Sequence, residues 1–517
     1  MERRCGVLLP IASLPSKYGI GCFSKEAYEF VDFLKKAGQT YWQILPLVQT
    51  GYGDSPYQSC STFAGNPYFI DPDSLVDAGY ITSDSLKEYE FGGDYGYVDY
   101  DKIYIERFKM LRTAYRNSPF ALETTGKWSS SLYDDDRKKF EKFNRRNFGW
   151  LMDYAIYSAI KDECGGIPFI EWDEGIRCRT PVAIQEVLDR SAEQIRFYEF
   201  VQYIFFEQWH KLKKYANDNG ILIIGDLPIY VAYDSADTWS HPELFLLDEN
   251  GYPDKVAGCP PDDFSENGQL WGNPLYCWDY HRLTSYLWWS RRMKHSLNMY
   301  DILRIDHFRG FESYYAIPYG DENAKGGEWL KGPGNEFFDV MKQIVGDGNI
   351  IAEDLGFKTW EVEKLLSDSG YPGMKVIEFS FSNPQKEEDL PKNFPKHAVV
   401  YTGTHDNQTL RSWYEGLDDE LKEHVNRHVN ITPRKNKIWA LIRCALETKC
   451  DTAIIPMQDY LELDDYARVN IPSTLGGLNW RYRLDDKMLT PSLARKMRRY
   501  ANETNRRDKR RKKEGSS

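Results

Sequence analysis

The sequence predicts an α/β protein, a (β/α)8 barrel with long and largely helical insertions between its strands. Three observations lead to this prediction: short apolar runs recur along the chain, helical patterns follow them, and acidic residues stand directly after several runs. Near-continuous apolar strands alternating with helices indicate a parallel sheet covered on both faces. Eight such repeats match a closed TIM barrel.

The expected strands are short, apolar and bounded by turn residues. They cover residues 6–9, 41–45, 221–225, 302–305, 349–352, 374–381, 398–402 and 452–456. The alternative is a doubly wound open sheet. The barrel is favoured because the chain has neither the GxGxxG nor the GxxxxGK[ST] loop of nucleotide-binding folds.

Uneven spacing between the expected strands predicts two insertions. The gap between the second and third runs is far too long for one crossover helix. We therefore expect residues 51–219 to form a mainly helical subdomain, inserted into a barrel made of residues 1–50 and 220–517. Apolar residues at spacings of three and four predict its helices. These are residues 103–115, 140–160 and 192–215. Residues 234–279, rich in Gly, Pro and aromatic residues, are expected to form a long active-site loop.

Composition narrows the classes of partner. The formal net charge of −12 argues against nucleic acid, because phosphate contacts need a concentrated positive field. Aromatic residues make up 15% of the chain, which suits a site that stacks on sugar rings, although most of them are expected in the core. The basic run at residues 495–517 is expected to be a solvated helix end and tail.

Cysteine usage and the N-terminal segment predict a cytoplasmic protein. The nine cysteines show no CxxC or CxxH spacing, so we expect reduced thiols and neither a disulfide framework nor a zinc site. Residues 1–6 lack the apolar region of a signal peptide, and no segment is apolar for long enough to span a bilayer.

Residues 301–310, DILRIDHFRG, combine a short buried strand with a dense run of ionisable groups. Because side chains alternate along a strand, Arg304 and Asp306 should share one face. A neighbouring arginine favours the ionised form of a carboxylate, which suits a nucleophile. A structural ion pair would explain the same motif equally well.

Four expected strands are followed directly by acids: Asp226, Asp306, Glu353 and Asp406, the last preceded by His405. In a barrel of this class the chemistry lies at the C-terminal ends of the strands, so these acids should meet at one rim. Their regular placement favours an active site over scattered ion pairs.

Two chemistries use several carboxylates without a cluster of Cys or His ligands. Oxygen-rich sites bind magnesium or manganese. Alternatively, one carboxylate attacks an anomeric carbon while a protonated carboxyl group donates to the leaving oxygen. The apolar residues 350–352 could keep Glu353 protonated near neutrality, whereas Arg304 favours ionised Asp306. The residues alone leave both chemistries open.

Motifs spread over nearly the whole chain resemble those of one enzyme family. They are DSPY at 54–57, FAGNP at 63–67, GDLP at 225–228, GCPPD at 258–262, GQLWGNP at 268–274, RIDHFRG at 304–310, AEDLG at 352–356, GTHDN at 403–407 and RVNIP at 468–472. The family is the 4-α-glucanotransferases, or amylomaltases and disproportionating enzymes, of glycoside hydrolase family 77 in the α-amylase clan. The resemblance implies a barrel without the clan's C-terminal β-sandwich.

The resemblance also implies roles for the acids. Asp306 would be the nucleophile, Glu353 the general acid and base, and Asp406 the stabiliser of the transition state, with His405 and Arg304 as substrate-binding neighbours.

Further binding residues follow from the same motifs. Tyr57 would stack on the sugar at the cleavage subsite, near Asp226, and Asn470 would make a polar contact. Phe264 and Trp271 would bind the acceptor from the long loop. Asp263 departs from the aromatic residue common beside Phe264, and Val469 and Ser473 replace the family's usual Met and Gly. Tyr52 resembles part of a remote second glucan site.

The implied function is a retaining 4-α-glucanotransferase. It would transfer a segment of an α-1,4-glucan to the 4-hydroxyl of an acceptor through a covalent glucosyl–Asp306 intermediate. The expected partners are malto-oligosaccharides and α-1,4-glucans, with no cofactor, metal, nucleic acid or membrane, and the protein is expected to be a monomer or homodimer. A hydrolase of α-glucans and an inactive glucan-binding protein are the alternatives.

Overall fold

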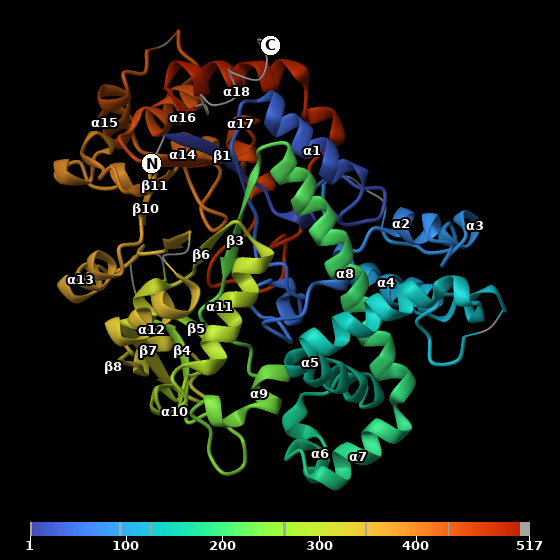
Figure 1. The fold of residues 1–517 in the computed structure, drawn as a ribbon. Helices are drawn as coiled ribbons and strands as arrows, with labels where there is room; N and C mark the ends of the chain where they lie inside the picture. Colours follow the sequence, from blue (N-terminus) through green and yellow to red (C-terminus); the bar gives the residue numbers. More distant parts are fainter. Residues whose placement is uncertain are drawn as a thin grey trace.

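The computed structural model describes residues 3–92, 96–124, 126–261, 265–346, 349–432 and 434–506. Eight parallel strands form one sheet in the order β10-β11-β12-β1-β2-β3-β6-β9. Figure 1 labels β1, β3, β6, β10 and β11 of this sheet. The strands are β1 (Arg4–Leu8), β2 (Tyr41–Gln43), β3 (Leu222–Leu227), β6 (Ile302–Ile305), β9 (Ile350–Ala352), β10 (Gly373–Val376), β11 (Ala398–Tyr401) and β12 (Thr452–Pro456). Each coincides with one expected run, and the predicted barrel is confirmed.

The barrel closes between β9 and β10, the two ends of this strand order. There the Ala352 N–H donates to the Pro372 carbonyl at 3.0 Å. The Asp354 carboxylate, just after β9, accepts the N–H of Met374 in β10 at 2.7 Å. A backbone bond and a side-chain bond therefore take the place of a regular ladder at this seam.

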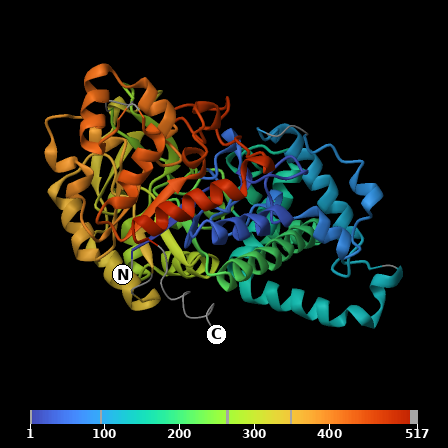
Figure 2. The same cartoon turned by 90° about the horizontal axis from the view of Figure 1, so that it is seen from above.

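Helices surround the barrel, as the view from above shows (Figure 2). Those between and after the strands are α1 (Lys25–Lys36), α10 (Trp278–Leu283), α11 (Leu287–Met299), α12 (Asn335–Val345), α13 (Trp360–Ser369), α14 (Leu410–Gly416), α15 (Asp419–Val429), α16 (Lys437–Glu447), α17 (Met457–Tyr460) and α18 (Pro491–Glu503). One repeat departs from the pattern: residues 377–397, all described, contain only 3-10 turns, so the strand expected over 374–381 ends early, at Val376. Of the basic segment, residues 507–517 lie outside the described residues.

The long segment between β2 and β3 is helical. It contains α2 (Pro72–Asp77), α3 (Ser83–Leu86), α4 (Tyr100–Arg116), α5 (Asp134–Glu163), α6 (Glu174–Arg177), α7 (Pro181–Arg190) and α8 (Ala192–Asp218). The three expected helices correspond to α4, α5 and α8. Helix α8 also packs on the barrel, where the Trp209 indole donates to the Met299 carbonyl at 3.0 Å. The division at residue 219 stays a prediction, because α8 belongs to the inserted segment and also packs against the barrel.

Residues 234–279 are more ordered than the expected loop. They contain α9 (Ala236–Ser240), β4 (Lys255–Cys259) and β5 (Gln269–Pro274). With β7 (Ser313–Pro318) and β8 (Glu328–Lys331) these strands form an antiparallel sheet in the order β5-β4-β7-β8. Strand β5 is difficult to recognise because its residues include Gln, Gly and Asn, and its sheet is completed by residues far along the chain.

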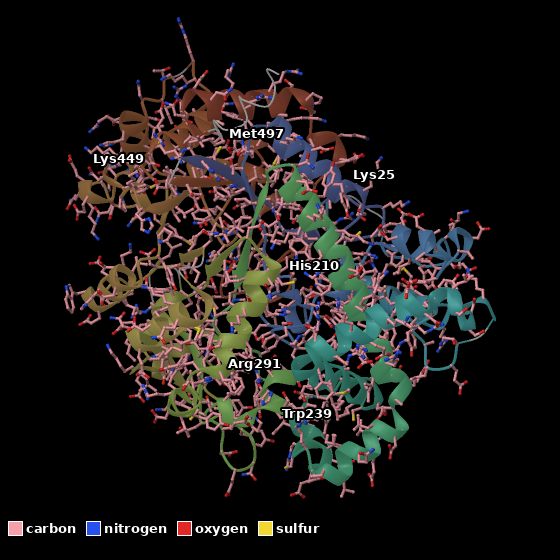
Figure 3. The ribbon with its side chains drawn as sticks, in the orientation of Figure 1. Lys25, His210, Trp239, Arg291, Lys449 and Met497 are labelled. Carbon is pink, nitrogen blue, oxygen red and sulfur yellow. The ribbon has the colours of Figure 1, made fainter. Side chains whose placement is uncertain are left out.

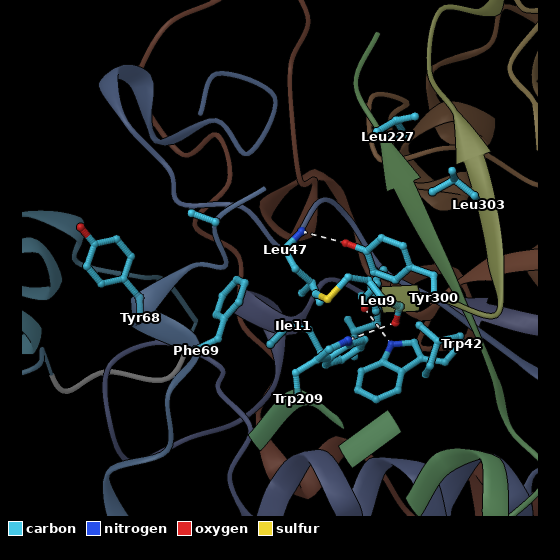
Figure 4. Packing of buried hydrophobic residues seen from close by; sticks show 14 of the residues in the cluster. Leu9, Ile11, Trp42, Leu47, Tyr68, Phe69, Trp209, Leu227, Tyr300 and Leu303 are labelled. Carbon is cyan, nitrogen blue, oxygen red and sulfur yellow. Dashed lines mark hydrogen bonds between the residues drawn. The ribbon is translucent and has the colours of Figure 1, made fainter. Parts of the chain in front are cut away.

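Buried aromatic residues connect the insertions with the barrel. Trp239 in α9, labelled in Figure 3, lies 6.0 Å from the Tyr157 ring of α5 and 5.6 Å from that of Trp172. In the close view of Figure 4, the Leu47 N–H donates to the Tyr300 hydroxyl at 3.4 Å. A Cβ at Gly225 would lie 2.1 Å from that tyrosine ring, so glycine is needed directly before the rim.

The part of the chain that the structure describes includes no helix with both the length and the apolar character that crossing a membrane requires. All nine cysteines are free thiols.

Candidate active site

Arg304 is the central cation of the rim. It lies in β6, is 4% exposed, and its Nη1 donates to both oxygens of Asp226 at 2.7 Å. The same nitrogen lies 2.9 Å from Oδ1 of Asp306, so the expected pairing of Arg304 and Asp306 is found. Burial opposes the charge, but the charges of Asp226 and Asp306 prevail and raise the pKa of Arg304 well above its ordinary value. The arginine therefore stays charged between two carboxylates.

Glu353 follows β9 and lies beside the loop that begins at Asp306. Its Oε2 accepts the backbone N–H of His307 at 2.8 Å, and its Oε1 accepts that of Leu355 at 2.7 Å. Burial raises the pKa of Glu353 to about 7; Arg304 opposes this shift and Asp306 adds to it. A carboxyl group with this pKa can hold a proton near neutrality, as the apolar run before it predicted.

The backbone at His307 makes this arrangement possible. His307 has φ 48° and ψ 48°, a left-handed conformation that is uncommon outside glycine. Burial, followed by the charge of Arg309, lowers the pKa of the imidazole to about 3, so the ring is neutral. His307 directly follows Asp306, and this turn directs its backbone N–H to the Glu353 carboxylate.

Asp406 follows β11 on the other side of the site. Its Oδ1 accepts the Asn470 amide at 2.6 Å, and the His405 Nε2 lies 3.4 Å from its Oδ2. The guanidinium of Arg468 donates to the Asp406 carbonyl at 2.7 Å and fixes the backbone. The Asp406 side chain is 44% exposed, so it remains accessible to a ligand.

Tyr57 joins the two sides of the site. Its hydroxyl donates to Asp226 at 2.8 Å, while its ring stacks on His405 with centroids 5.2 Å apart and planes at 12°. Burial, and then the charge of Asp226, raises the pKa of Tyr57 well above its ordinary value, so the phenol stays a donor. Trp480 packs against both rings, at 5.8 Å from Tyr57 and 5.9 Å from His405.

Trp271 reaches the site from the second sheet. It lies in β5, and its ring meets the His307 imidazole edge-on at 4.9 Å. The Gln58 amide donates to the Trp271 carbonyl at 3.1 Å and ties the strand to the loop that carries Tyr57. Phe264 lies outside the described residues.

The structure thus brings together nine of the ten residues expected at the site. They are Tyr57, Asp226, Trp271, Arg304, Asp306, Glu353, His405, Asp406 and Asn470. Within the described part of the chain, no group of three or more His, Cys, Asp and Glu side chains has an arrangement that would hold a metal ion.

Comparison with known families shows where the chain as a whole belongs. A family model described as 4-alpha-glucanotransferase matches residues 9–490, nearly the whole chain. The chain belongs to the 4-α-glucanotransferase family.

Individual members of the 4-α-glucanotransferase family are similar over their full length. The 4-α-glucanotransferase of Streptococcus pneumoniae is 47% identical over 494 residues, which is 95% of each chain. That of Clostridium butyricum is 47% identical over 489 residues, 94% of this chain and 97% of the relative. The solved structure of the Streptococcus agalactiae amylomaltase in complex with acarbose has a TM-score of 0.93 at 40% identity, covering 98% of this chain and 100% of that one.

Two acids near the site of this family member were not expected from the sequence. Glu378 is 4% exposed, and its Oε2 accepts the Asn407 amide at 2.9 Å. Asp459 is 2% exposed and accepts the N–H of Leu410 at 2.9 Å. Burial, and then the charge of Asp459, raises the pKa of Glu378 well above its ordinary value. Burial and the neighbouring charge therefore favour the uncharged form of Glu378.

Glu378 connects with Asp406 through a short chain of hydrogen bonds. The Asn407 Oδ1 accepts the N–H of Thr404 at 2.9 Å and its hydroxyl at 2.8 Å. The Thr404 Oγ1 in turn accepts the N–H of Asp406 at 3.2 Å. Because each partner fixes the next, Glu378 orients the backbone that carries Asp406.

A signal for both acids exists in the sequence. Glu378 follows β10 and Asp459 follows β12, so each stands just beyond a barrel strand. The strand expected over 374–381 included Glu378, so this residue was not counted among those that follow a strand. Asp459 is three positions beyond the end of β12. Trp480 has no comparable signal, because it lies far along the chain with φ 65° in an irregular segment.

Proposed function

We propose that this protein is a retaining 4-α-glucanotransferase that acts through a covalent glucosyl–Asp306 intermediate. The supporting observation is the contrast between two neighbouring carboxyl groups. Asp306 faces the permanent charge of Arg304 at 2.9 Å, whereas burial raises the pKa of Glu353 to about 7. A carboxylate beside a carboxyl group that can hold a proton is the pair that retaining glycoside chemistry requires.

In the first step Glu353 gives its proton to the oxygen of the scissile α-1,4 bond, and Asp306 attacks the anomeric carbon. The bond from that carbon to the leaving oxygen breaks, a bond to the Asp306 carboxylate forms, and the reducing-end fragment departs. Tyr57 offers its ring to the sugar face at this subsite, and Asp406, with its exposed carboxylate, binds sugar hydroxyls.

In the second step Glu353, now a carboxylate, takes the proton from the 4-hydroxyl of an acceptor glucan. That oxygen attacks the anomeric carbon and releases Asp306, so two displacements retain the configuration. Water competes with the acceptor at this point. Trp271 supports transfer, because its ring lies next to His307 and offers the acceptor an apolar surface where water would otherwise gather.

Purified protein with maltotriose provides the test, with products resolved by length and reducing ends counted over time. Transfer breaks one α-1,4 bond for each bond it makes. We therefore expect glucose together with a ladder of longer oligomers, at a nearly constant number of reducing ends. Reducing ends that rise steadily from the first minutes would mean that water is the main acceptor, and the protein would then be a hydrolase.

We also propose that the protein works in the cytoplasm as a monomer or homodimer. The nine free thiols support a reducing compartment. Cell fractionation and light scattering of the purified protein test these two points.

A further inference from the structure

Three large aromatic side chains are exposed on β8 and on the segment that leads from β9 into α13. Trp329 in β8 is 38% exposed, Phe357 after β9 is 71% exposed, and Trp360, the first residue of α13, is 69% exposed. Scattered exposed aromatics need no explanation, but a group of them marks a place where a partner or ligand binds. We call these three residues the outer aromatic platform.

Arg309 ties two members of the platform to the active site. Its guanidinium lies 3.8 Å from the centre of the Trp329 ring, and its Nη1 donates to the Phe357 carbonyl at 2.6 Å. Arg309 comes three positions after Asp306, and Phe357 comes four positions after Glu353. The two catalytic loops are therefore joined inside the site, where the N–H groups of His307 and Phe308 donate to Glu353, and again by Arg309 at the platform.

The third member is held on the same side. The Thr359 side chain accepts the N–H of Val362 and fixes the start of α13, and with it Trp360. Lys331, which shares a face of β8 with Trp329, lies close enough to Glu361 for their charges to interact. Strand β8 and helix α13 lie on one side of the molecule in Figure 1.

We propose that the outer aromatic platform binds the acceptor glucan, and the leaving fragment of the donor, several sugar units away from the scissile bond. This inference rests on the proposed function. Glu353 protonates the leaving oxygen and later takes the acceptor's proton, so both chains lie on its side of the cleft. The platform borders both catalytic loops, because Phe357 lies four positions after Glu353 and its carbonyl accepts from Arg309 of the Asp306 loop.

The chemistry of the surface fits an α-1,4-glucan. Glucose units present apolar ring faces that stack on aromatic rings, and a neutral chain needs no charged partner. The cation–π contact with Arg309 holds the Trp329 ring in place before a ligand arrives, which lowers the entropic cost of binding. The platform would then favour long acceptors over short ones.

The test compares acceptors of different length at a fixed donor concentration. We expect Phe357→Ala, and more strongly Phe357→Ala with Trp360→Ala, to lower the ratio of kcat/KM for maltoheptaose to that for glucose. A fall of about tenfold corresponds to ~1.4 kcal/mol. Both side chains are exposed, so the variants should keep the parent's melting temperature.

Phe148→Ala is the matched control, because Phe148 is 61% exposed on α5, in the helical segment between β2 and β3. It should leave the ratio unchanged. Calorimetric titration of maltoheptaose into Asp306→Asn, with and without Phe357→Ala, gives a second readout, in which the platform substitution weakens binding.

The outcomes separate the two proposals. If the unsubstituted protein forms no transfer products, the proposed function fails. If transfer is normal but the length ratio and the affinity do not respond to Phe357→Ala and Trp360→Ala, only the platform fails. A change of oligomeric state in place of a change in the ratio would assign the aromatic surface to contacts between copies of this chain, and would overturn the inference.

Discussion

At the scale of single residues, the position of Arg304 decides how the neighbouring acids behave. It is almost fully buried and holds Asp226 and Asp306 at hydrogen-bonding distance. Removing one partner from a buried ion pair costs more than the pair itself contributes, because the remaining charge is left uncompensated. Asp226 therefore positions the arginine, and the arginine positions Asp306.

Asp306→Asn should abolish turnover while the protein still binds glucan. An amide cannot replace the nucleophile, and single losses of this kind reduce kcat by roughly 10⁴- to 10⁶-fold. Initial rates with maltotriose and calorimetric titration test the two parts. Asp279→Asn, at a side chain 95% exposed on α10, is the control. A rate for Asp306→Asn within tenfold of the parent would rule out the assigned role.

The pH dependence should follow Glu353. The first step needs its protonated form, and its pKa is about 7, so kcat/KM is full below that pH and falls roughly tenfold per unit above it. Asp306 contributes to this raised pKa, so Asp306→Asn should lower it. Carbon-13 NMR titration of glutamate-labelled protein measures the shift, and an unchanged value would contradict the coupling.

Glu378 should tolerate an uncharged replacement of the same shape. Because burial favours its uncharged form, the neutral side chain of Glu378→Gln can still accept from Asn407, and we expect activity within about threefold of the parent. Glu378→Ala leaves the Asn407 amide without its partner, a loss of ~1–3 kcal/mol at a buried site. We expect kcat to fall by at least tenfold, with KM less affected. Equal kinetics for the two variants would remove Glu378 from the positioning of Asp406.

At the scale of elements, strands buried on both faces could be predicted from the sequence, whereas the partly exposed strands β5 and β8 could not. Residues 350–352 form β9, and they are apolar because both faces of this strand are buried. Phe379 and Phe381 continued the apolar pattern after β10, although they belong to a 3-10 turn. Periodicity alone does not separate these cases.

The same limit applies to the site. Asp306 and Glu353 stand directly after strands, so topology alone places them at one rim. Contacts made by distant irregular segments, such as Trp480 on Tyr57, depend on how loops return to the barrel. Asn470 was expected only through resemblance to a family, because no spacing in the sequence relates it to Asp406.

The antiparallel sheet gives an element-scale prediction at Gly258 in β4. A Cβ there would lie 2.1 Å from the Gln269 carbonyl of β5, so Gly258→Ala must push the two strands apart. Trp271 would move with β5, and we expect the ratio of transfer to hydrolysis to fall. Counting reducing ends against oligomer products measures this ratio. Gly416→Ala, where a Cβ meets open space, is the control. An unaltered ratio would show that β5 does not position the acceptor.

At the scale of the whole molecule, the charges of the rim are balanced by the protein's own arginine. Arg304 faces Asp226 and Asp306, where a divalent ion would otherwise be the obvious counter-charge. We expect activity to survive dialysis against EDTA without change. Activity that is lost on chelation and restored by magnesium would favour the metal alternative for these carboxylates.

The seam between β9 and β10 has a consequence for motion. Strand β1 is paired on both sides, with β12 and β2, so its amide hydrogens lie within regular ladders whichever side they face. At the seam, β9 and β10 are joined by a single backbone bond and by one bond to an aspartate carboxylate. We expect hydrogen–deuterium exchange, followed by mass spectrometry, to be faster over β9 and β10 than over β1. The barrel would then open locally beside Glu353, the residue that we propose gives up a proton and takes one back in every catalytic cycle.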